Sequence, residues 1–255
     1  MMPLEHRLDR SVIIQASPET VFRYFTDSAR WAAWWGSGST IDARPGGRVY
    51  VRYPTGDEAA GEVLEVNPPD RIVFSYGYVS GTPMPVGASR VTVQLTAVDG
   101  ATRLELRHEL SDAGARDQHV QGWRYQLSLF GNLVADAQNR GAASLVDEWF
   151  AAWAEPNVEA RTAALRRIAS DRVQFRDRFS LIDGLEELVQ HIDGAQRFMP
   201  GIRMQRSGDV RHCQGLVLAD WRAQTANDET RGSGVNVFDL QADGRLRAVT
   251  GFWNS

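Results

Sequence analysis

The chain has 255 residues, a length that two domains of average size would fill. Apolar residues make up 43% and charged residues 24% of it, as in ordinary globular proteins, so each half can bury a modest core. The formal net charge is −4, and the sequence has no long basic stripe. The chain therefore lacks the positive charge that is typical of nucleic-acid-binding proteins.

The targeting and metal-binding signals are also weak. The first residues, "MMPLEHRLDRSVIIQ", carry scattered charges and no apolar signal core. No apolar run approaches the roughly 20 residues needed to cross a bilayer. The single cysteine, Cys213, excludes an internal disulfide and a multi-cysteine metal site. We therefore expect a cytoplasmic protein with no membrane association, no metal and no cofactor.

The chain begins with a predicted strand over 11–16. A helix should follow to about residue 26, because Ser17 is a favourable N-cap and Pro18 suits the first helical position. The next segment, "RWAAWWG", reads as a tryptophan-rich loop. For any single tryptophan core packing is the commoner role, although large aromatic rings also line cavities for apolar ligands.

The rest of the first half reads as strands followed by one long helix. Alternating apolar and polar side chains predict strands over 48–53, 59–66, 71–78, 89–98 and 101–110. A stripe at three- and four-residue spacing, which includes Trp123 and Leu127, predicts a helix over about 116–138. An antiparallel sheet needs a partner for its apolar face, and this helix is the element long enough to cover it. A curved sheet around one helix would leave a cavity between them.

A second unit begins where the helical pattern pauses at Gly141. Helices are predicted up to about 154, over 157–169 and over 184–197, and strands over 202–211, 215–225, 231–240 and 245–253. Helices followed by a curved antiparallel sheet indicate an α+β cone whose open face is closed by the helices.

The stretch "VQFRDRFSLIDG" (173–184) carries the most informative side chain. Alternation puts Val173, Phe175, Asp177 and Phe179 on one face, so a carboxylate lies on the apolar side of the sheet. Desolvation there would raise its pKa and make it a better base. The commoner alternative is an aspartate at the strand end that accepts hydrogen bonds from the backbone or from a tryptophan N–H.

Residues 8 to about 137 resemble the SRPBCC (START-like, helix-grip) superfamily, and within it the branch named for the activator of the heat-shock chaperone ATPase. The matching pieces are "ASPETVFRYFTD", "RWAAWWG", "ARPGGRVYV", "GEVLEVNPPDRIVFSY", "SRVTVQLTAVDGATRLELRHEL" and "HVQGWRYQLSLFGNLV". This resemblance implies the helix-grip fold, in a branch of mostly small bacterial proteins.

Residues 142–255 resemble the SnoaL-like group of the nuclear-transport-factor-two-like fold, through "LVDEWFAAWAEPN", "RVQFRDRFSLIDGLEELVQHI" and "GVNVFDLQADGRLRAVTGFW". The fold includes polyketide cyclases, ketosteroid isomerases and plain binding domains. In the isomerases the acid at this strand end is the base, which implies that role for Asp177. Trp149 then lies at the position of the isomerase tyrosine and Asn236 at or near that of the late aspartate, so the oxyanion donors differ from the family's.

Two sets of candidate site residues follow. The tentative catalytic set is Asp177, Asn236 and Trp149. The ligand-binding set is Trp34, Trp35, Phe74, Tyr76, His108, Trp123, Leu127, Trp153, Phe175, His191 and Trp221. A lone inward histidine such as His108 is more often a satisfied core group, and His119 has no partner by spacing.

The sequence thus predicts two α+β domains, a helix-grip domain over 8–138 and a cone-shaped barrel of the SnoaL or ketosteroid-isomerase type over 142–255. The leading hypothesis is a binding protein for a small hydrophobic or polycyclic molecule, with a pocket in each domain. A cofactor-free isomerase or cyclase with Asp177 as base is the rival, and a chaperone co-regulator is the third alternative. A homodimer through the outer face of the second sheet is also expected.

Overall fold

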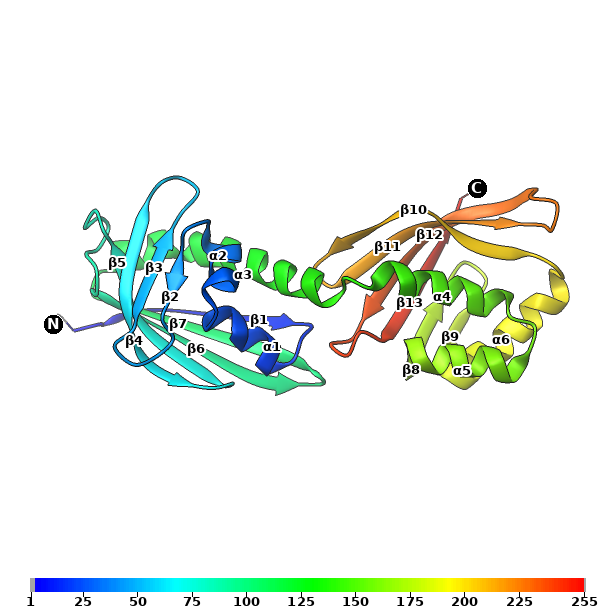
Figure 1. Ribbon diagram of the computed structural model, residues 1–255, viewed down its shortest axis with the longest axis horizontal. Coiled ribbons are helices and arrows are strands. Elements are labelled where there is room, and N and C mark those ends of the chain that lie inside the picture. Colours follow the sequence, from blue (N-terminus) through cyan, green and yellow to red (C-terminus); the bar gives the residue numbers. More distant parts are fainter. Residues whose placement is uncertain (1–2, 255) are drawn as a thin grey trace. The chain divides into compact units, whose positions relative to one another are not determined.

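The computed structural model describes residues 3–254, and the chain divides into two compact units between Ala135 and Asp136. Each unit contains one sheet with helices packed on it (Figure 1). Among the helices within 3–254, none is long and apolar enough to cross a membrane.

The N-terminal unit is built on a seven-stranded sheet with the order β1-β7-β6-β5-β4-β3-β2, in which every neighbouring pair is antiparallel. Its strands are β1 (His6–Ile14), β2 (Thr40–Ile41), β3 (Arg48–Arg52), β4 (Glu58–Asn67), β5 (Arg71–Tyr78), β6 (Ser89–Val98) and β7 (Ala101–Leu110). Its helices are α1 (Pro18–Phe22), a 3-10 turn (Arg23–Phe25), α2 (Ser28–Trp35) and α3 (Ala113–Gln138).

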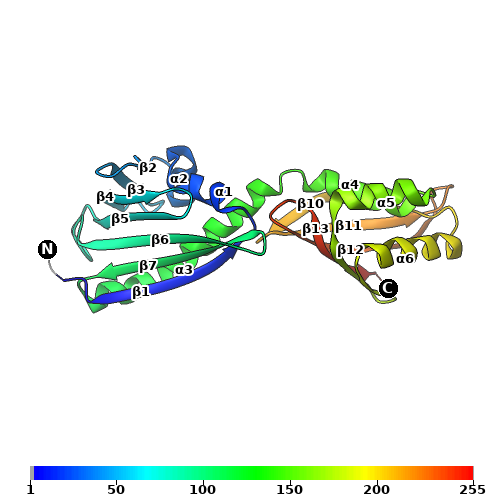
Figure 2. The ribbon, with the colours of Figure 1, turned by 90° about the horizontal axis from the view of Figure 1, so that it is seen from below.

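The long helix α3 runs along one face of this sheet (Figure 2). The carboxylate of Asp112 accepts the backbone N–H of Ala115 at 2.7 Å and so caps the first turn. The predicted apolar stripe is buried, and Phe130 in its middle contacts Phe25 and Trp34 with ring centroids 5.4 and 4.8 Å apart. The helix-grip arrangement expected from the sequence is therefore confirmed.

The tryptophan-rich segment is a helix, so the prediction of a loop was wrong there. Asp27 caps α2, because its side chain accepts the backbone N–H of Arg30 at 2.9 Å. Helical spacing lets Trp31, Trp34 and Trp35 all enter the core, with at most 4% of each exposed. The Asp27 cap and the alanines of this segment favour a helix, and burial of the tryptophan side in the core stabilises its two turns.

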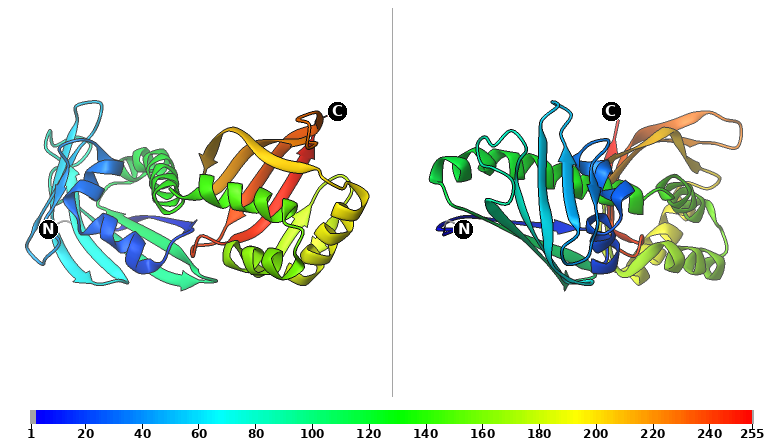
Figure 3. Two further views of the ribbon diagram at one scale, coloured as in Figure 1. Left: turned by 45° about the vertical axis from the view of Figure 1, so that its right-hand side comes forward. Right: turned by 60° about the vertical axis from the view of Figure 1, so that its left-hand side comes forward.

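The C-terminal unit has a six-stranded sheet with the order β10-β11-β12-β13-β8-β9. Its helices are α4 (Ala142–Ala154), α5 (Val158–Ile168) and α6 (Leu185–Phe198), and α4 crosses one face of the sheet (Figure 3). Its strands are β8 (Ala169–Arg176), β9 (Leu181–Asp183), β10 (Arg203–Cys213), β11 (Leu216–Gln224), β12 (Thr230–Leu240) and β13 (Leu246–Trp253). The pair of β13 with β8 is parallel, whereas the other pairs are antiparallel.

The predicted α+β class holds for both units, but neither sheet closes on itself. In the second unit β10 and β9 are the two edges, so the expected cone-shaped barrel is an open curved sheet. Its concave side is filled by α4 and by the aromatic residues Trp149, Phe150 and Phe238, each at most 1% exposed. Helices that cover the open side bury the apolar face without the strand tilt and stagger that barrel closure requires.

The strand that precedes Asp177 is shorter than the alternation suggests. Val173 and Phe175 are buried as predicted, but β8 ends at Arg176. Backbone hydrogen bonds between Asp177 and Ser180 close a turn, and Phe179 is 71% exposed instead of facing the core. The alternation prediction was therefore wrong beyond Arg176, because a turn resets which way each side chain points.

Candidate functional site

An aromatic cavity lies between the sheet of the N-terminal unit and α3. Its volume is about 450 Å³. Helix α2 contributes Trp34 and Trp35, and Tyr53 follows β3. Strand β5 contributes Tyr76 and Tyr78, and α3 contributes His119, Trp123 and Gln126.

Gly36 is the residue that lets one wall of the cavity form. It ends α2 with a φ of +140°, and a Cβ at this position would lie 2.2 Å from the carbonyl oxygen of Arg52. Only glycine permits the end of α2 to approach β3 this closely. The approach places Trp35 against Tyr53, whose ring centroids are 5.8 Å apart.

The rings around the cavity form a closed circuit of contacts. Trp35 contacts both Trp123 and Tyr53, at 5.5 and 5.8 Å between ring centroids. Tyr53 stacks on Tyr78 at 6.2 Å, and Tyr78 lies 6.0 Å from His119. His108, which is itself fully buried, completes the circuit through contacts with His119 at 5.0 Å and with Trp123 at 6.0 Å. These aromatic contacts, which are edge-to-face, tilted or stacked, hold each ring in place, so the cavity wall is preorganised.

Two tyrosine hydroxyls meet at this wall. Those of Tyr53 and Tyr76 are joined by a short hydrogen bond. Burial raises the pKa of both Tyr53 and Tyr76 well above the usual range of a phenol. The cavity therefore presents neutral phenols that can donate and accept hydrogen bonds, and no phenolate at physiological pH.

His108 is saturated with hydrogen bonds behind the cavity wall. The indole N–H of Trp123 donates to its Nδ1 at 3.0 Å, and its Nε2 lies 2.8 Å from the hydroxyl oxygen of Ser89. Burial, together with a smaller effect of the neighbouring His119, lowers the pKa of His108 to about 3. These contacts give His108 the role of a satisfied, neutral core histidine, which the sequence left as the commoner alternative.

His119 differs from His108 because one of its nitrogens has no partner. Its Nδ1 lies 2.7 Å from the carbonyl oxygen of Ala115, one turn earlier in α3. Its Nε2 is buried without a hydrogen-bond partner, as is the indole nitrogen of Trp35. The indoles of Trp31 and Trp34 instead donate to backbone carbonyls, at 3.1 and 3.4 Å.

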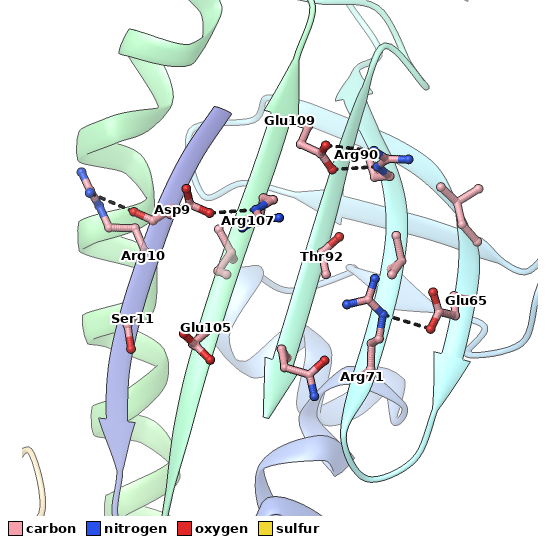
Figure 4. A pocket seen from close by; sticks show the side chains of 14 residues that line it. Asp9, Arg10, Ser11, Glu65, Arg71, Arg90, Thr92, Glu105, Arg107 and Glu109 are labelled. Carbon is pink, nitrogen blue, oxygen red and sulfur yellow. Dashed lines mark hydrogen bonds and ion pairs between the residues drawn. The ribbon is translucent and has the colours of Figure 1, made fainter. Parts of the chain in front are cut away.

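A larger concavity of about 840 Å³ lies on the outer face of the same sheet, and Figure 4 shows its side chains. Cross-strand ion pairs cover its floor. Arg90 binds both oxygens of Glu109 at 2.8 and 2.9 Å, and Arg107 binds Asp9 at 2.9 Å. Because these arginines already bind carboxylates of the same face, the concavity offers little unsatisfied charge to a ligand. We take it as a solvated sheet surface.

In the second unit, Asp177 lies half-buried in the turn after β8. One carboxylate oxygen accepts the backbone N–H of Phe179 at 2.9 Å, and the other accepts the indole N–H of Trp253 at 3.0 Å. Both oxygens thus have structural donors, as the second alternative from the sequence describes. Asn236 is near: a Cβ built on Gly251 would lie 3.1 Å from its Oδ1 and 3.3 Å from the Cβ of Asp177.

The remaining candidates of the second unit belong to its aromatic core. Trp149 contacts Phe175 and Phe238, with ring centroids 5.9 and 6.1 Å apart. Trp153 contacts both Phe175 and His191, and Nε2 of His191 lies 3.2 Å from the hydroxyl of Ser180. Trp221 lies apart from this group and packs on Trp253 at 4.8 Å.

The structure sorts the candidates of the first unit into two groups. Trp34, Trp35, Tyr76 and Trp123 line the aromatic cavity, whereas Phe74, His108 and Leu127 lie in the core around it. Sequence reasoning missed the other lining residues, among them Tyr53, Tyr78, His119 and Gln126. A signal existed for His119, which precedes Trp123 by one helical turn, and for Tyr78, which shares a strand face with Tyr76.

Three comparisons with known proteins bear on the fold. Residues 15–135 match the family model described as activator of Hsp90 ATPase homolog 1-like protein. No curated protein matches the chain.

Several solved structures are similar to about half of the chain. A SnoaL-like family protein from Agrobacterium tumefaciens is 21% identical, with 47% of this chain and 99% of that one covered and a TM-score of 0.43. CalU16 from Micromonospora echinospora is 25% identical over 52% of this chain and 79% of that one, with a TM-score of 0.43. The Aha1 dimer from Colwellia psychrerythraea is 16% identical over 51% and 96%, with a TM-score of 0.45. The match to the activator of Hsp90 ATPase homolog 1-like family model thus covers most of the N-terminal unit, and the solved structures similar to this chain include a protein of the SnoaL-like family.

Proposed function

We propose that the protein binds a small hydrophobic molecule in the aromatic cavity of its N-terminal domain. The observation that carries the proposal is the cavity itself, about 450 Å³ bounded mainly by tryptophan and tyrosine rings. This volume falls within the range of roughly 300 to 1,000 Å³ that is typical of small-molecule sites.

Imperfect packing does not account for a space of this size. Protein interiors are close-packed, and voids much larger than a water molecule are few. Here the rings contact one another around the space and do not collapse into it. A preformed apolar site costs little reorganisation on binding, which favours affinity for a flat apolar ligand.

The rival proposal, a proton-transfer enzyme with Asp177 as base, receives less support. Each oxygen of Asp177 already accepts a structural hydrogen bond, one from the backbone of its own turn and one from Trp253, so the carboxylate has a role in holding the turn after β8 to β13. A ligand site in the second domain, a homodimer, a cytoplasmic location and a chaperone partner stay predictions. Light scattering on the purified chain tests the dimer directly, and a monomeric mass contradicts it.

The binding proposal is tested with the uncharged fluorescent probe N-phenyl-1-naphthylamine. Gly122 lies on α3 at the cavity, and a Cβ built there meets no atom within 4 Å. Gly122→Leu should therefore fill part of the cavity without disturbing its neighbours. We expect the probe's fluorescence to rise on binding to the natural protein, and its affinity to fall at least tenfold in the variant.

Gly194→Leu is the matched control. Gly194 is also a helical glycine whose added Cβ meets nothing within 4 Å, but it lies on α6 of the second domain. Both changes favour the helix by up to about 1 kcal/mol. Equal loss of binding in both variants, or no binding by the natural protein, overturns the proposal.

A further inference from the structure

Three tyrosines line the aromatic cavity from the side of the sheet, and we call Tyr53, Tyr76 and Tyr78 the tyrosine cluster. The ring centroids of Tyr53 and Tyr76 lie 6.2 and 5.8 Å from that of Tyr78. The two tyrosines of β5 reach from the sheet toward α3, because Tyr76 and Tyr78 lie 6.1 and 6.0 Å from the ring of His119. A hydroxyl is the end of a tyrosine side chain furthest from its own strand. The hydroxyls therefore lie on the side of the sheet that faces α3 and the cavity.

The cluster has one hydroxyl proton too many. Tyr53 and Tyr76 carry two hydroxyl protons and share one hydrogen bond, so one O–H of this pair is left over. Besides burial, Tyr78 helps to raise the pKa of both, so its hydroxyl lies near theirs. A donation to Tyr78 only passes the excess on, because the proton of Tyr78 is then left over instead. Closing three hydroxyls into a ring would need bent, weak hydrogen bonds.

The excess O–H belongs to a residue that a ligand can reach. Tyr76 is 1% exposed, and an unpaired hydroxyl proton is costly in such a place, so the Tyr76 hydroxyl donates to Tyr53. Tyr53 and Tyr78 are only half-buried, and both line the cavity. Within residues 3–254, neither of their hydroxyls is among the polar atoms that are fully buried without a partner. The available donor is therefore a phenol of Tyr53 or Tyr78.

The cavity offers no charge to a ligand. No Asp, Glu, Lys or Arg is among the described residues that line it. A charged ligand would lose its hydration there without gaining a counter-ion, which is expensive. Because the walls are mainly aromatic rings, the site suits an uncharged, largely apolar molecule with few polar groups.

From these observations we propose that the ligand is an uncharged, largely apolar molecule with a carbonyl group, whose oxygen accepts the excess O–H of Tyr53 or Tyr78. This inference rests on the proposed function and adds the chemical class of its ligand. A carbonyl oxygen accepts and brings no proton, whereas a hydroxyl would add a further donor to a cluster that already has an excess. Aromatic ketones meet the description. Plain hydrocarbons leave the donor unpaired, and carboxylates bring a charge.

Probe pairs that differ only in a carbonyl group test the inference. We choose 1-indanone with indane, benzophenone with diphenylmethane, and 9-fluorenone with fluorene, measured by displacement of N-phenyl-1-naphthylamine from the whole chain at neutral pH. In a cavity without a donor each ketone should bind more weakly than its hydrocarbon, because the carbonyl loses its hydrogen bonds with water. We expect at least one ketone to bind as tightly as its hydrocarbon or more tightly. Fluorene-9-carboxylate should bind more weakly than either neutral three-ring probe.

The variant Tyr53→Phe/Tyr76→Phe/Tyr78→Phe keeps the three rings and removes every hydroxyl of the cluster, so no buried hydroxyl is left unpaired. The affinity of the preferred ketone should fall about tenfold relative to its hydrocarbon, the effect of one buried hydrogen bond. The hydrocarbon's own affinity should stay within about twofold, because the apolar walls are unchanged. Tyr50→Phe is the matched control, since Tyr50 lies on β3 outside the cavity, and it should leave both affinities unchanged.

The infrared carbonyl band of bound 9-fluorenone gives a readout that does not depend on affinity. A hydrogen bond to the oxygen weakens the C=O bond and lowers its stretching frequency. The band should therefore lie below its position in hexane when the ketone is bound to the natural protein, and it should return toward that position in the triple variant. The measurement on the natural protein decides the inference even where the triple variant does not fold.

The outcomes separate the two proposals. If N-phenyl-1-naphthylamine binds but every ketone is weaker than its hydrocarbon, or none of the six neutral probes displaces it, the ligand class is wrong although the binding function stands. A carbonyl band at its hexane position, or a ketone preference that survives in the triple variant, also contradicts the ligand class. If N-phenyl-1-naphthylamine itself does not bind, the proposed function fails and this inference fails with it.

Discussion

The indole N–H of Trp123 donates to Nδ1 of His108 at 3.0 Å, so a residue of α3 fixes the tautomer of a residue of β7. Because Nδ1 accepts, Nε2 carries the proton and donates to the hydroxyl of Ser89 at 2.8 Å. Ser89 in turn donates to the carbonyl oxygen of Tyr76 at 2.8 Å. This chain of hydrogen bonds links helix, sheet and cavity wall, and it requires a neutral His108.

The stability of the N-terminal domain should consequently fall in mild acid. The pKa of His108 is lowered to about 3 in the folded state, against about 6.5 in an unfolded chain. Between these values the unfolded state binds more protons, so stability is complete above pH 6.5 and declines as pH falls. His108 alone contributes a slope approaching 1.4 kcal/mol per pH unit. Hydrogen exchange of the β6 and β7 amides between pH 7 and pH 5 measures it.

His108→Gln provides the comparison for this experiment. Removing the titrating ring should flatten the decline over the same pH range, whatever the variant costs at pH 7. His119, whose pKa is also lowered by burial, should leave a residual slope in the variant. An unchanged slope would show that His108 is protonated in the folded protein and would contradict its assigned tautomer.

Tyr53 and Tyr76 should not ionise in the folded protein at pH 11. Burial raises the pKa of both phenols, and their hydroxyls bond to each other. The tyrosinate absorbance reached at pH 11 should therefore be the same in the natural protein, which has 6 tyrosines, and in a Tyr53→Phe/Tyr76→Phe double variant. A smaller amplitude in the double variant would mean that solvent hydroxide reaches this pair.

Arg161 should be one of the most sensitive positions of the second domain. Its side chain is fully buried, and its guanidinium donates to the Glu155 carbonyl at 2.8 Å, Gln196 at 2.9 Å and Asp193 at 3.2 Å. Arg161→Ala removes all three of these buried hydrogen bonds and should lower the free energy of unfolding by about 3 kcal/mol in urea denaturation.

Arg197→Ala is the matched control, because Arg197 binds the same Asp193 carboxylate from the surface. Its side chain is 78% exposed, so the loss should stay below about 1 kcal/mol. Similar losses for the two variants would show that the buried hydrogen bonds of Arg161 add nothing beyond a surface ion pair.

Asp177→Asn should affect the stability of the second domain and leave probe binding unchanged. An amide retains one acceptor oxygen but places an NH2 group against either Phe179 N or the Trp253 indole, which both donate. We expect a loss of about 1 kcal/mol in urea denaturation. Unaltered stability together with weaker ligand binding would revive the proposal that Asp177 acts on a ligand.

Most elements could be predicted because their signals are local. Alternation along 101–110 puts Leu104, Leu106 and His108 on the buried face, and Ser17 caps α1 as expected. The sequence-based prediction was wrong in two segments, where local signals did not decide the structure. The segment "RWAAWWG" was predicted as a loop, but burial of all three tryptophans in the core favours the helix α2. After Arg176 a turn ended an alternation that the sequence alone continued.

The sequence by itself determined the two α+β domains, their order and the aromatic character of the first, because periodicity and composition act over neighbouring residues. Only the tertiary structure decided which polar groups are satisfied. His108 and His119 lie eleven positions apart on β7 and α3, yet packing gives the first partners on both nitrogens and leaves Nε2 of the second without one. Hydrogen bonding depends on the position of distant chain segments to within a fraction of an ångström, and no local pattern encodes that.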